Sequence, residues 1–176
     1  MKNQIVLDSK SIERALNRVA HEILESVPDH FPLGFVGIHT RGIPLAYRLQ
    51  SLCAKFEPGR PVLPVGKLDI TFHRDDLSKS LPLPKETEIP FDISDQMIIL
   101  VDDVLFTGRT ISAALNALVD LGRPKTTRLA VLVDRGHREL PIRADYVGKN
   151  LPTSLDQSVK VKLLETDGTE DEVQLL

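Results

Sequence analysis

At 176 residues, the chain has the length of one ordinary domain and is long enough to bury a hydrophobic core. Hydrophobic residues make up 41% of it and charged residues 27%, a balance that excludes overall disorder. The net charge of -3 argues against a non-specific nucleic-acid binder, and no apolar run is long enough to span a membrane. The amino terminus lacks the apolar stretch of a signal peptide, and the lone Cys53 excludes a disulfide framework or a thiolate metal site. We therefore expect a cytoplasmic protein.

The first part of the chain predicts two strands, each followed by a helix. Residues 5–7 indicate a short edge strand, and a helix follows to about residue 27, with one apolar stripe at helical spacing. Residues 34–39 predict the first central strand, and residues 43–53 predict a helix. The turn between them, Thr40-Arg41-Gly42, places a glycine and an arginine at the carboxyl end of a strand, which suits an anion.

The next stretch is less regular. Residues 62–70 predict a strand interrupted by Pro64 and Gly66. Residues 71–92 are polar and contain several prolines, so we expect no long element there. A long loop inside a compact domain is usually functional or disordered, and a surface hairpin without a catalytic part is the alternative.

The most informative stretch is residues 97–110, MIILVDDVLFTGRT. Its apolar start is typical of a strand buried on both faces of a parallel sheet. Asp102 and Asp103 follow at once, at the carboxyl end where open α/β sheets bind ligands. Carboxylates at this position suit a sugar diol or a hydrated Mg2+.

The turn Thr107-Gly108-Arg109-Thr110 follows, and then a predicted helix over residues 111–121. This turn is a suitable phosphate-binding site, because it offers free backbone N–H groups at a helix start, two hydroxyls and an arginine. A ribose 5-phosphate would suit the whole stretch, because its hydroxyls could bind the two carboxylates and its phosphate could bind the turn. The turn has neither the Gly-Lys-Ser/Thr of a Walker loop nor the G-x-G-x-x-G of a dinucleotide turn. The simpler alternative, acids that only cap the next helix, requires one Asp and not the whole pattern.

The remaining chain predicts a strand over residues 128–133, with Asp134 and Arg135 at its carboxyl end, and two short strands over 145–148 and 158–164. Residues 123–150 hold seven Lys or Arg and three acids, a local charge of +4, whereas residues 165–176 form an acidic tail of five acids without a base. Within the basic stretch, residues 137–143 could be an RNA surface or a solvated loop.

The whole span 97–110 resembles the 5-phosphoribosyl-1-diphosphate (PRPP) motif of type I phosphoribosyltransferases. Together with Thr40-Arg41-Gly42 and the segments 69–78 and 133–150, it resembles the bifunctional pyrimidine operon regulator and uracil phosphoribosyltransferase family of bacteria, from about residue 5 to about residue 165. The resemblance implies an α/β type I phosphoribosyltransferase fold in a single domain over residues 1–176. That fold has a central, mostly parallel twisted sheet flanked by helices, a flexible lid loop at about 71–92 and a small hood.

The resemblance also implies the reaction, uracil plus PRPP giving UMP plus diphosphate, and the residues that carry it. Asp102 and Asp103 would hold the ribose hydroxyls beside the developing positive charge, Arg74 would reach the diphosphate from the lid, and Mg2+ would be held through PRPP rather than by the protein alone. The expected PRPP and UMP contacts are Thr40, Arg41, Gly42, Asp102, Asp103, Val104, Leu105, Phe106, Thr107, Gly108, Arg109, Thr110, Asp134 and Arg135, with the backbone near Val147 and Val159 lining a uracil slot.

A second function is implied, UMP-responsive binding to a leader mRNA hairpin that attenuates transcription of pyrimidine genes. Arg14, Arg18 and His21 form a stripe along the first predicted helix, and the resemblance adds Arg138 and Arg143. From the sequence alone this stripe indicates a solvated face, and Asn17 stands where a hydroxyl residue is expected. The family also implies a homodimer or homotetramer. The alternative function is a stand-alone salvage phosphoribosyltransferase for another base, without a role in RNA binding.

Overall fold

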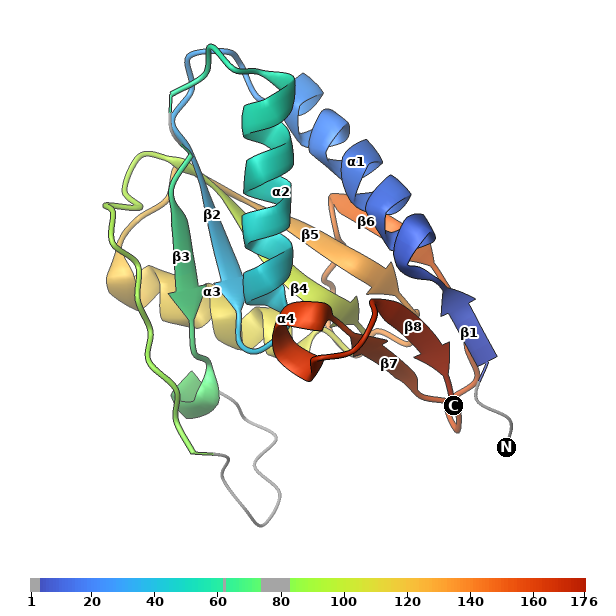
Figure 1. Ribbon diagram of the computed structural model, residues 1–176. Helices are drawn as coiled ribbons and strands as arrows, with labels where there is room; N and C mark the ends of the chain where they lie inside the picture. The colour runs from blue at the N-terminus through green and yellow to red at the C-terminus, as the bar shows by residue number, and fades with distance from the viewer. Residues whose placement is uncertain (1–3, 62, 74–82) are drawn as a thin grey trace.

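The structure is a computed structural model that describes residues 4–61, 63–73 and 83–176. Its centre is a five-stranded sheet in which every neighbouring pair is parallel (Figure 1). The strand order is β3 (Val65–Leu68), β2 (Leu33–Ile38), β4 (Met97–Leu105), β5 (Thr126–Asp134) and β6 (Tyr146–Asn150). Because the strands are parallel, their carboxyl ends share one edge of the sheet.

Helices cover both faces of this sheet, which explains the unbroken apolar runs of the central strands. Helices α1 (Ser9–Ser26) and α2 (Gly42–Phe56) pack on one face, and α3 (Arg109–Leu121) packs on the other. Alternate β4 residues supply the two cores: Ile99 and Val101 belong to the first, and Ile98 and Leu100 to the second.

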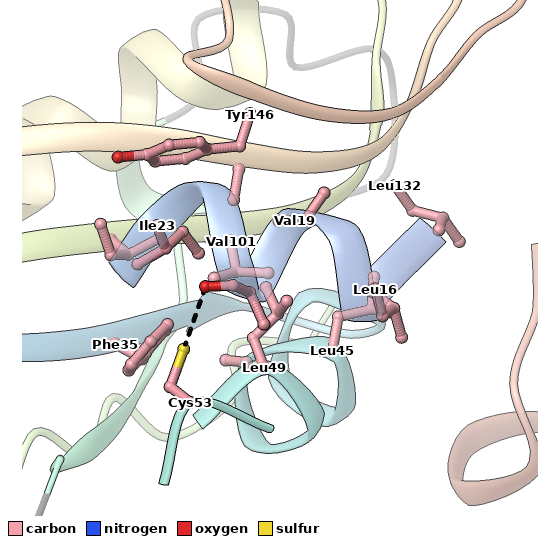
Figure 2. Packing of buried hydrophobic residues seen from close by; sticks show 14 of the residues in the cluster. Leu16, Val19, Ile23, Phe35, Leu45, Leu49, Cys53, Val101, Leu132 and Tyr146 are labelled. Carbon is pink, nitrogen blue, oxygen red and sulfur yellow. Dashed lines mark hydrogen bonds between the residues drawn. The ribbon is translucent and has the colours of Figure 1, made fainter. Parts of the chain in front are cut away.

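The packing of the first core explains the apolar stripe of α1. The Asp8 carboxylate caps α1 by accepting a hydrogen bond from the Ser11 amide at 2.8 Å. Figure 2 shows Leu16, Val19 and Ile23 of α1 packed with residues of α2, among them Cys53. The Cys53 thiol is buried and donates to the Ala20 carbonyl at 3.8 Å, so this cysteine is a small core residue.

A second, antiparallel sheet forms a hood, defined here as β1 (Gln4–Leu7), β7 (Val159–Lys162), α4 (Leu164–Asp167) and β8 (Glu172–Leu175), with strand order β1-β8-β7. Figure 1 shows α4 and the hood near the arrowhead end of the parallel sheet. The stretch interpreted as an acidic tail is therefore folded. Three of its acids form ion pairs there, because Arg48 binds Glu165 and Asp171, and Lys162 binds Glu172.

Several predicted boundaries shift. β4 continues past residue 101 to Leu105, because its pairing with β5 extends to Leu105 and Asp134, so both acids lie within the strand. β3 is shorter than predicted, and a 3-10 turn, η1 (Thr71–His73), follows it. The described end of the predicted lid, from residue 83, runs beside β3 through a bridge between Lys67 and Glu88. Arg74, the predicted lid residue, lies outside the described residues. No helix in the described ranges has the length and hydropathy needed to cross a bilayer.

Candidate active site

Two turns meet at the carboxyl edge of the sheet. β2 ends at Ile38, a cis peptide bond joins His39 to Thr40, and α2 begins at Gly42. A Cβ atom on Gly42 would lie 2.3 Å from the Val101 carbonyl oxygen and 3.3 Å from the Asp102 Cα. Only a glycine permits this approach, so the predicted anion turn lies directly against the strand that carries the acids.

A cavity of about 330 Å3 opens at this meeting point. Its polar lining comes from five separate segments of the chain, and it includes His39, Thr40, Arg41, Asp69, Thr71, Lys85, Asp102, Asp103 and Thr110. The cavity therefore combines carboxylates with two cations. Such a lining suits a ligand that carries hydroxyl groups and negative charge at different points.

The two acids are held by their own backbone. The Asp103 amide donates to the Asp102 carboxylate at 2.9 Å, and the Val104 amide donates to the Asp103 carboxylate at 2.9 Å. Asp102 is only 6% exposed, yet both residues line the cavity. Burial raises the pKa of Asp103, and the positive charge of Arg41 opposes that rise. The ionisation of Asp103 therefore depends on the cation across the cavity.

The predicted phosphate turn lies beside this cavity. Gly108 has a φ of 94°, a conformation that favours glycine, and as the N-cap of α3 it offers no side-chain hydrogen bond. The first-turn amides of α3 are thus not capped by the N-cap side chain, which suits an anion. Residues 104–111, with Glu139, line a second cavity of about 350 Å3. Val104 and Thr110 line both cavities, so the two adjoin.

The segment 137–143, which the sequence marked as basic, contacts the phosphate turn. The amides of Glu139 and Leu140 donate to the Thr107 carbonyl at 2.9 and 3.2 Å. Arg138 donates to the Phe106 carbonyl at 2.8 Å and forms an ion pair with Asp134. The Arg138 guanidinium therefore contacts protein groups at Phe106 and Asp134. Its RNA contact stays a prediction.

Arg135 also has a structural partner. It is 6% exposed, its guanidinium lies 4.1 Å from the Phe106 ring centroid, and it donates to the Thr153 hydroxyl at 3.1 Å and the Gln157 carbonyl at 2.7 Å. Burial lowers the pKa of this guanidinium. Arg135 thus fixes Phe106, the residue before the phosphate turn, to the loop that follows β6.

The residues expected on the base side of the site do not line these two cavities. Among the described lining residues of the two cavities, none is Asp134, Arg135, Val147 or Val159. The Val147 and Gly148 carbonyls instead accept hydrogen bonds from the Arg18 guanidinium at 3.1 and 2.7 Å. Contacts of these residues with a base therefore remain predictions.

The predicted RNA stripe lies on the exposed side of α1. Arg14, Arg18 and His21 are exposed, and so is Arg143 in the loop before β6. Arg18 also pairs with Glu22 at 2.7 Å, and His21 stacks on Phe56 with ring centroids 4.0 Å apart. The structure thus presents four of the five predicted RNA residues at the surface.

Sequence reasoning missed several residues of the site, among them His39, Asp69 and Thr71, and two others that it missed form ion pairs or hydrogen bonds to the predicted anion turn. The Lys85 ammonium donates to the Thr40 hydroxyl at 2.5 Å, and its amide donates to Asp69 at 2.9 Å, which brings a cation from the predicted lid into the first cavity. Asp167 of the hood receives two hydrogen bonds from Arg41, at 3.1 and 2.6 Å. No local pattern distinguishes Lys85 from a solvated lysine or Asp167 from the other acids of the tail.

Comparisons with known proteins agree with this geometry. The model of the phosphoribosyl transferase domain family matches residues 3–166. A protein of Deinococcus radiodurans named Bifunctional protein PyrR is 60% identical over 167 residues, which covers 94% of this chain and 90% of that protein. A Thermus aquaticus protein of the same name is 59% identical over 172 residues, 97% of this chain and 93% of its own.

Solved structures confirm the fold. The hypoxanthine phosphoribosyltransferase of Trypanosoma cruzi superposes with a TM-score of 0.72 at 18% identity, covering 98% of this chain and 95% of its own. The Staphylococcus aureus enzyme of the same name has a TM-score of 0.67 at 20% identity, covering 85% and 77%. At such identities the likeness concerns the fold alone. The family model and the close relatives confirm the expectation from the sequence: this chain belongs to the phosphoribosyl transferase family and is similar over nearly its whole length to the bifunctional PyrR proteins.

Proposed function

We propose that this chain transfers the 5-phosphoribosyl group of PRPP to uracil at the two adjoining cavities. One observation carries the proposal: the phosphate turn and the Asp102–Asp103 pair line neighbouring cavities that share Val104 and Thr110. A phosphorylated sugar whose 5-phosphate occupies the second cavity would place its hydroxyls beside the two acids. The name of the relatives, which calls them bifunctional, is consistent with an enzyme that has a second role.

The 5-phosphate would be held by the first-turn amides of α3 and by the hydroxyls of Thr107 and Thr110. Gly108 makes this possible, because its left-handed backbone turns the chain from β4 into the helix with no side chain over the seat. Arg109 lies at the rim of the turn, where Glu139 pairs with it at 2.8 Å and offsets its charge.

Asp102 and Asp103 would accept hydrogen bonds from the ribose hydroxyls and face the charge that develops at C1. In the reaction the bond from C1 to the diphosphate oxygen breaks, and that oxygen keeps the electron pair. N1 of uracil bonds to C1 and releases its proton. Positive charge builds on the sugar in the transition state, so carboxylates that are already in place stabilise it without reorganising.

Arg41 and Lys85 would face the leaving diphosphate, with Arg74 as the predicted third cation. The donor set also suits Mg2+, because it consists of hard carboxylate oxygens. Among the described residues no group of three or more His, Cys, Asp or Glu could hold a metal, so substrate oxygens would complete the coordination. When bound, Mg2+ would neutralise charge on the diphosphate.

Asp103→Asn tests the reaction. The variant keeps the size of the side chain and removes its charge, so we expect a folded protein whose kcat falls roughly 100-fold or more. Asp156→Asn is the matched control, since Asp156 is exposed and lines neither cavity. Steady-state assays with PRPP and each of uracil, hypoxanthine and guanine would identify the base. A wild-type rate for Asp103→Asn would remove the carboxylates from the mechanism, and turnover with a purine alone would favour the salvage alternative.

The second proposed role is UMP-responsive binding of a leader mRNA hairpin, through Arg14, Arg18, His21, Arg138 and Arg143. The exposure of four of these residues supports it. Filter binding of a hairpin RNA would be measured against salt, with and without UMP. Arg14→Gln should reduce the salt slope by about 1, whereas the exposed hood residue Lys160, changed to Gln, should not. A salt-independent affinity would rule out phosphate contacts. We also propose a homodimer or homotetramer, which sedimentation of the purified protein would test.

A further inference from the structure

The hood contributes a carboxylate to the diphosphate side of the site. Asp167, at the end of α4, is 126 positions from Arg41 in the chain. Arg41 donates from Nε to one Asp167 oxygen at 3.1 Å and from Nη2 to the other at 2.6 Å. Two parallel hydrogen bonds between a planar guanidinium and a carboxylate fix the direction of the arginine as well as its position.

The carboxylate is itself held in place. Asp167 also accepts a hydrogen bond from the Leu163 amide at 2.9 Å, which closes the short helix α4. Arg48 of α2 anchors the same segment through Glu165, with a 2.6 Å ion pair, and through Asp171. The Asp167 carboxylate that supports Arg41 is therefore held in place by other contacts of its segment.

The ion pair leaves one edge of Arg41 for a ligand. Nε and one hydrogen of Nη2 point to Asp167. Nη1 and the other hydrogen of Nη2 have no hydrogen bond within the described part of the chain, and Arg41 lines the cavity beside Asp102 and Asp103. A guanidinium held along one edge can still bind a phosphate group with its other edge.

We propose that Asp167 is the positioning residue for Arg41, so that the hood orients the cation that contacts the diphosphate of PRPP. The proposal rests on the proposed function in giving Arg41 that contact. Preorganisation predicts that removing the carboxylate weakens diphosphate binding, because the free arginine must then be ordered by the ligand. If Asp167 acted only through its charge, removing the carboxylate would strengthen diphosphate binding, because one negative charge that repels the anion would be gone.

The binding of diphosphate in the presence of MgCl2, measured by titration calorimetry, separates these two effects. Asp167→Asn keeps an oxygen that can accept from the Leu163 amide, and we expect it to raise the Kd of diphosphate roughly three- to tenfold. Glu170→Gln is the matched control, because Glu170 is an exposed acid of the same segment, and the ion pairs of Arg41 and Arg48 are with other carboxylates. It should leave the Kd within about twofold of the wild-type value.

A double-mutant cycle with Arg41→Gln shows whether the effect acts through the arginine. Asp167→Asn should weaken binding only when Arg41 is present. In turnover, it should raise the KM for PRPP roughly three- to tenfold by the same reasoning, and leave the KM for uracil unchanged. If Asp167→Asn does not fold, Asp167→Glu replaces it, since the longer side chain keeps the charge but moves the carboxylate out of its place beside Arg41. Its Kd should rise to a similar extent.

A Kd that stays unchanged or falls in Asp167→Asn, or an equal effect in the Arg41→Gln background, would overturn the proposal. So would a wild-type protein that does not bind diphosphate. Diphosphate binding with the expected cycle, but no turnover of PRPP with any base, would instead overturn the proposed function and leave the positioning role of Asp167 intact.

Discussion

Gly42→Ala is the substitution that most directly tests how the two turns meet. An added Cβ atom would lie 2.3 Å from the Val101 carbonyl oxygen and 3.2 Å from the Val101 carbonyl carbon. Both neighbours are backbone atoms of the central strand β4, which cannot rotate aside as a side chain can. Ordinary contact would require α2 and the preceding turn to move by about 1 Å from β4.

The expected cost follows from this displacement. Overpacking of a well-packed interior costs roughly 1–3 kcal/mol, and the higher helix propensity of alanine returns at most about 1 kcal/mol. A net loss of about 2 kcal/mol would lower the Tm of a chain of this size by roughly 4–8 °C. The same shift carries Arg41 away from the two acids, and a displacement of about 1 Å can reduce kcat/KM roughly 100-fold.

Calorimetric melting and the kcat/KM for PRPP would be measured on Gly42→Ala and on Gly59→Ala. A Cβ atom on Gly59 would have no neighbour within 4 Å, so that variant should match the wild type or gain up to about 1 kcal/mol. A Gly42→Ala protein with the Tm and kcat/KM of the wild type would refute the close approach of the two turns.

Three further predictions concern titratable groups. Because burial raises the pKa of Asp103, kcat/KM for PRPP should rise with pH through an apparent pKa above the ordinary aspartate value of 3.8. A limb at or below 3.8 would contradict the raised pKa of Asp103. Hydrogen bonds from Arg48 lower the pKa values of Asp171 and Glu165, so the two carboxylates stabilise the folded state. This stabilisation is complete above the ordinary carboxyl range, and it is lost as pH falls through the lowered pKa values. Urea unfolding between about pH 3 and 6 should show this loss in the wild type and less of it in Arg48→Gln. Burial raises the pKa of Cys53 to about 12, so a thiol reagent at about pH 8 should label it quickly in urea and slowly in the native protein; fast native labelling would mean that the core around α1 and α2 is open.

The sequence alone determined the features that depend on neighbouring residues. The apolar run before Asp102 and the glycine turn before α3 specify a buried strand and an anion-binding helix start, because both signals lie within fourteen consecutive residues. The turn at Gly42 was predicted in the same way. These local patterns, together with the family resemblance, were sufficient for the fold class and the family.

Tertiary structure decided which charged residues reach the site. Lys85 and Asp167 lie in stretches without periodicity, and only the paths of the segment after residue 83 and of the hood bring them to Thr40 and Arg41. Conversely, Arg135 was predicted as a PRPP contact and Arg138 as an RNA contact, and in the structure they donate to the Gln157 and Phe106 carbonyls, which lie in distant segments of the chain. The physical reason is that a charged side chain has no preferred partner in the sequence. Its partner is whichever group the folded backbone places within about 3 Å of it.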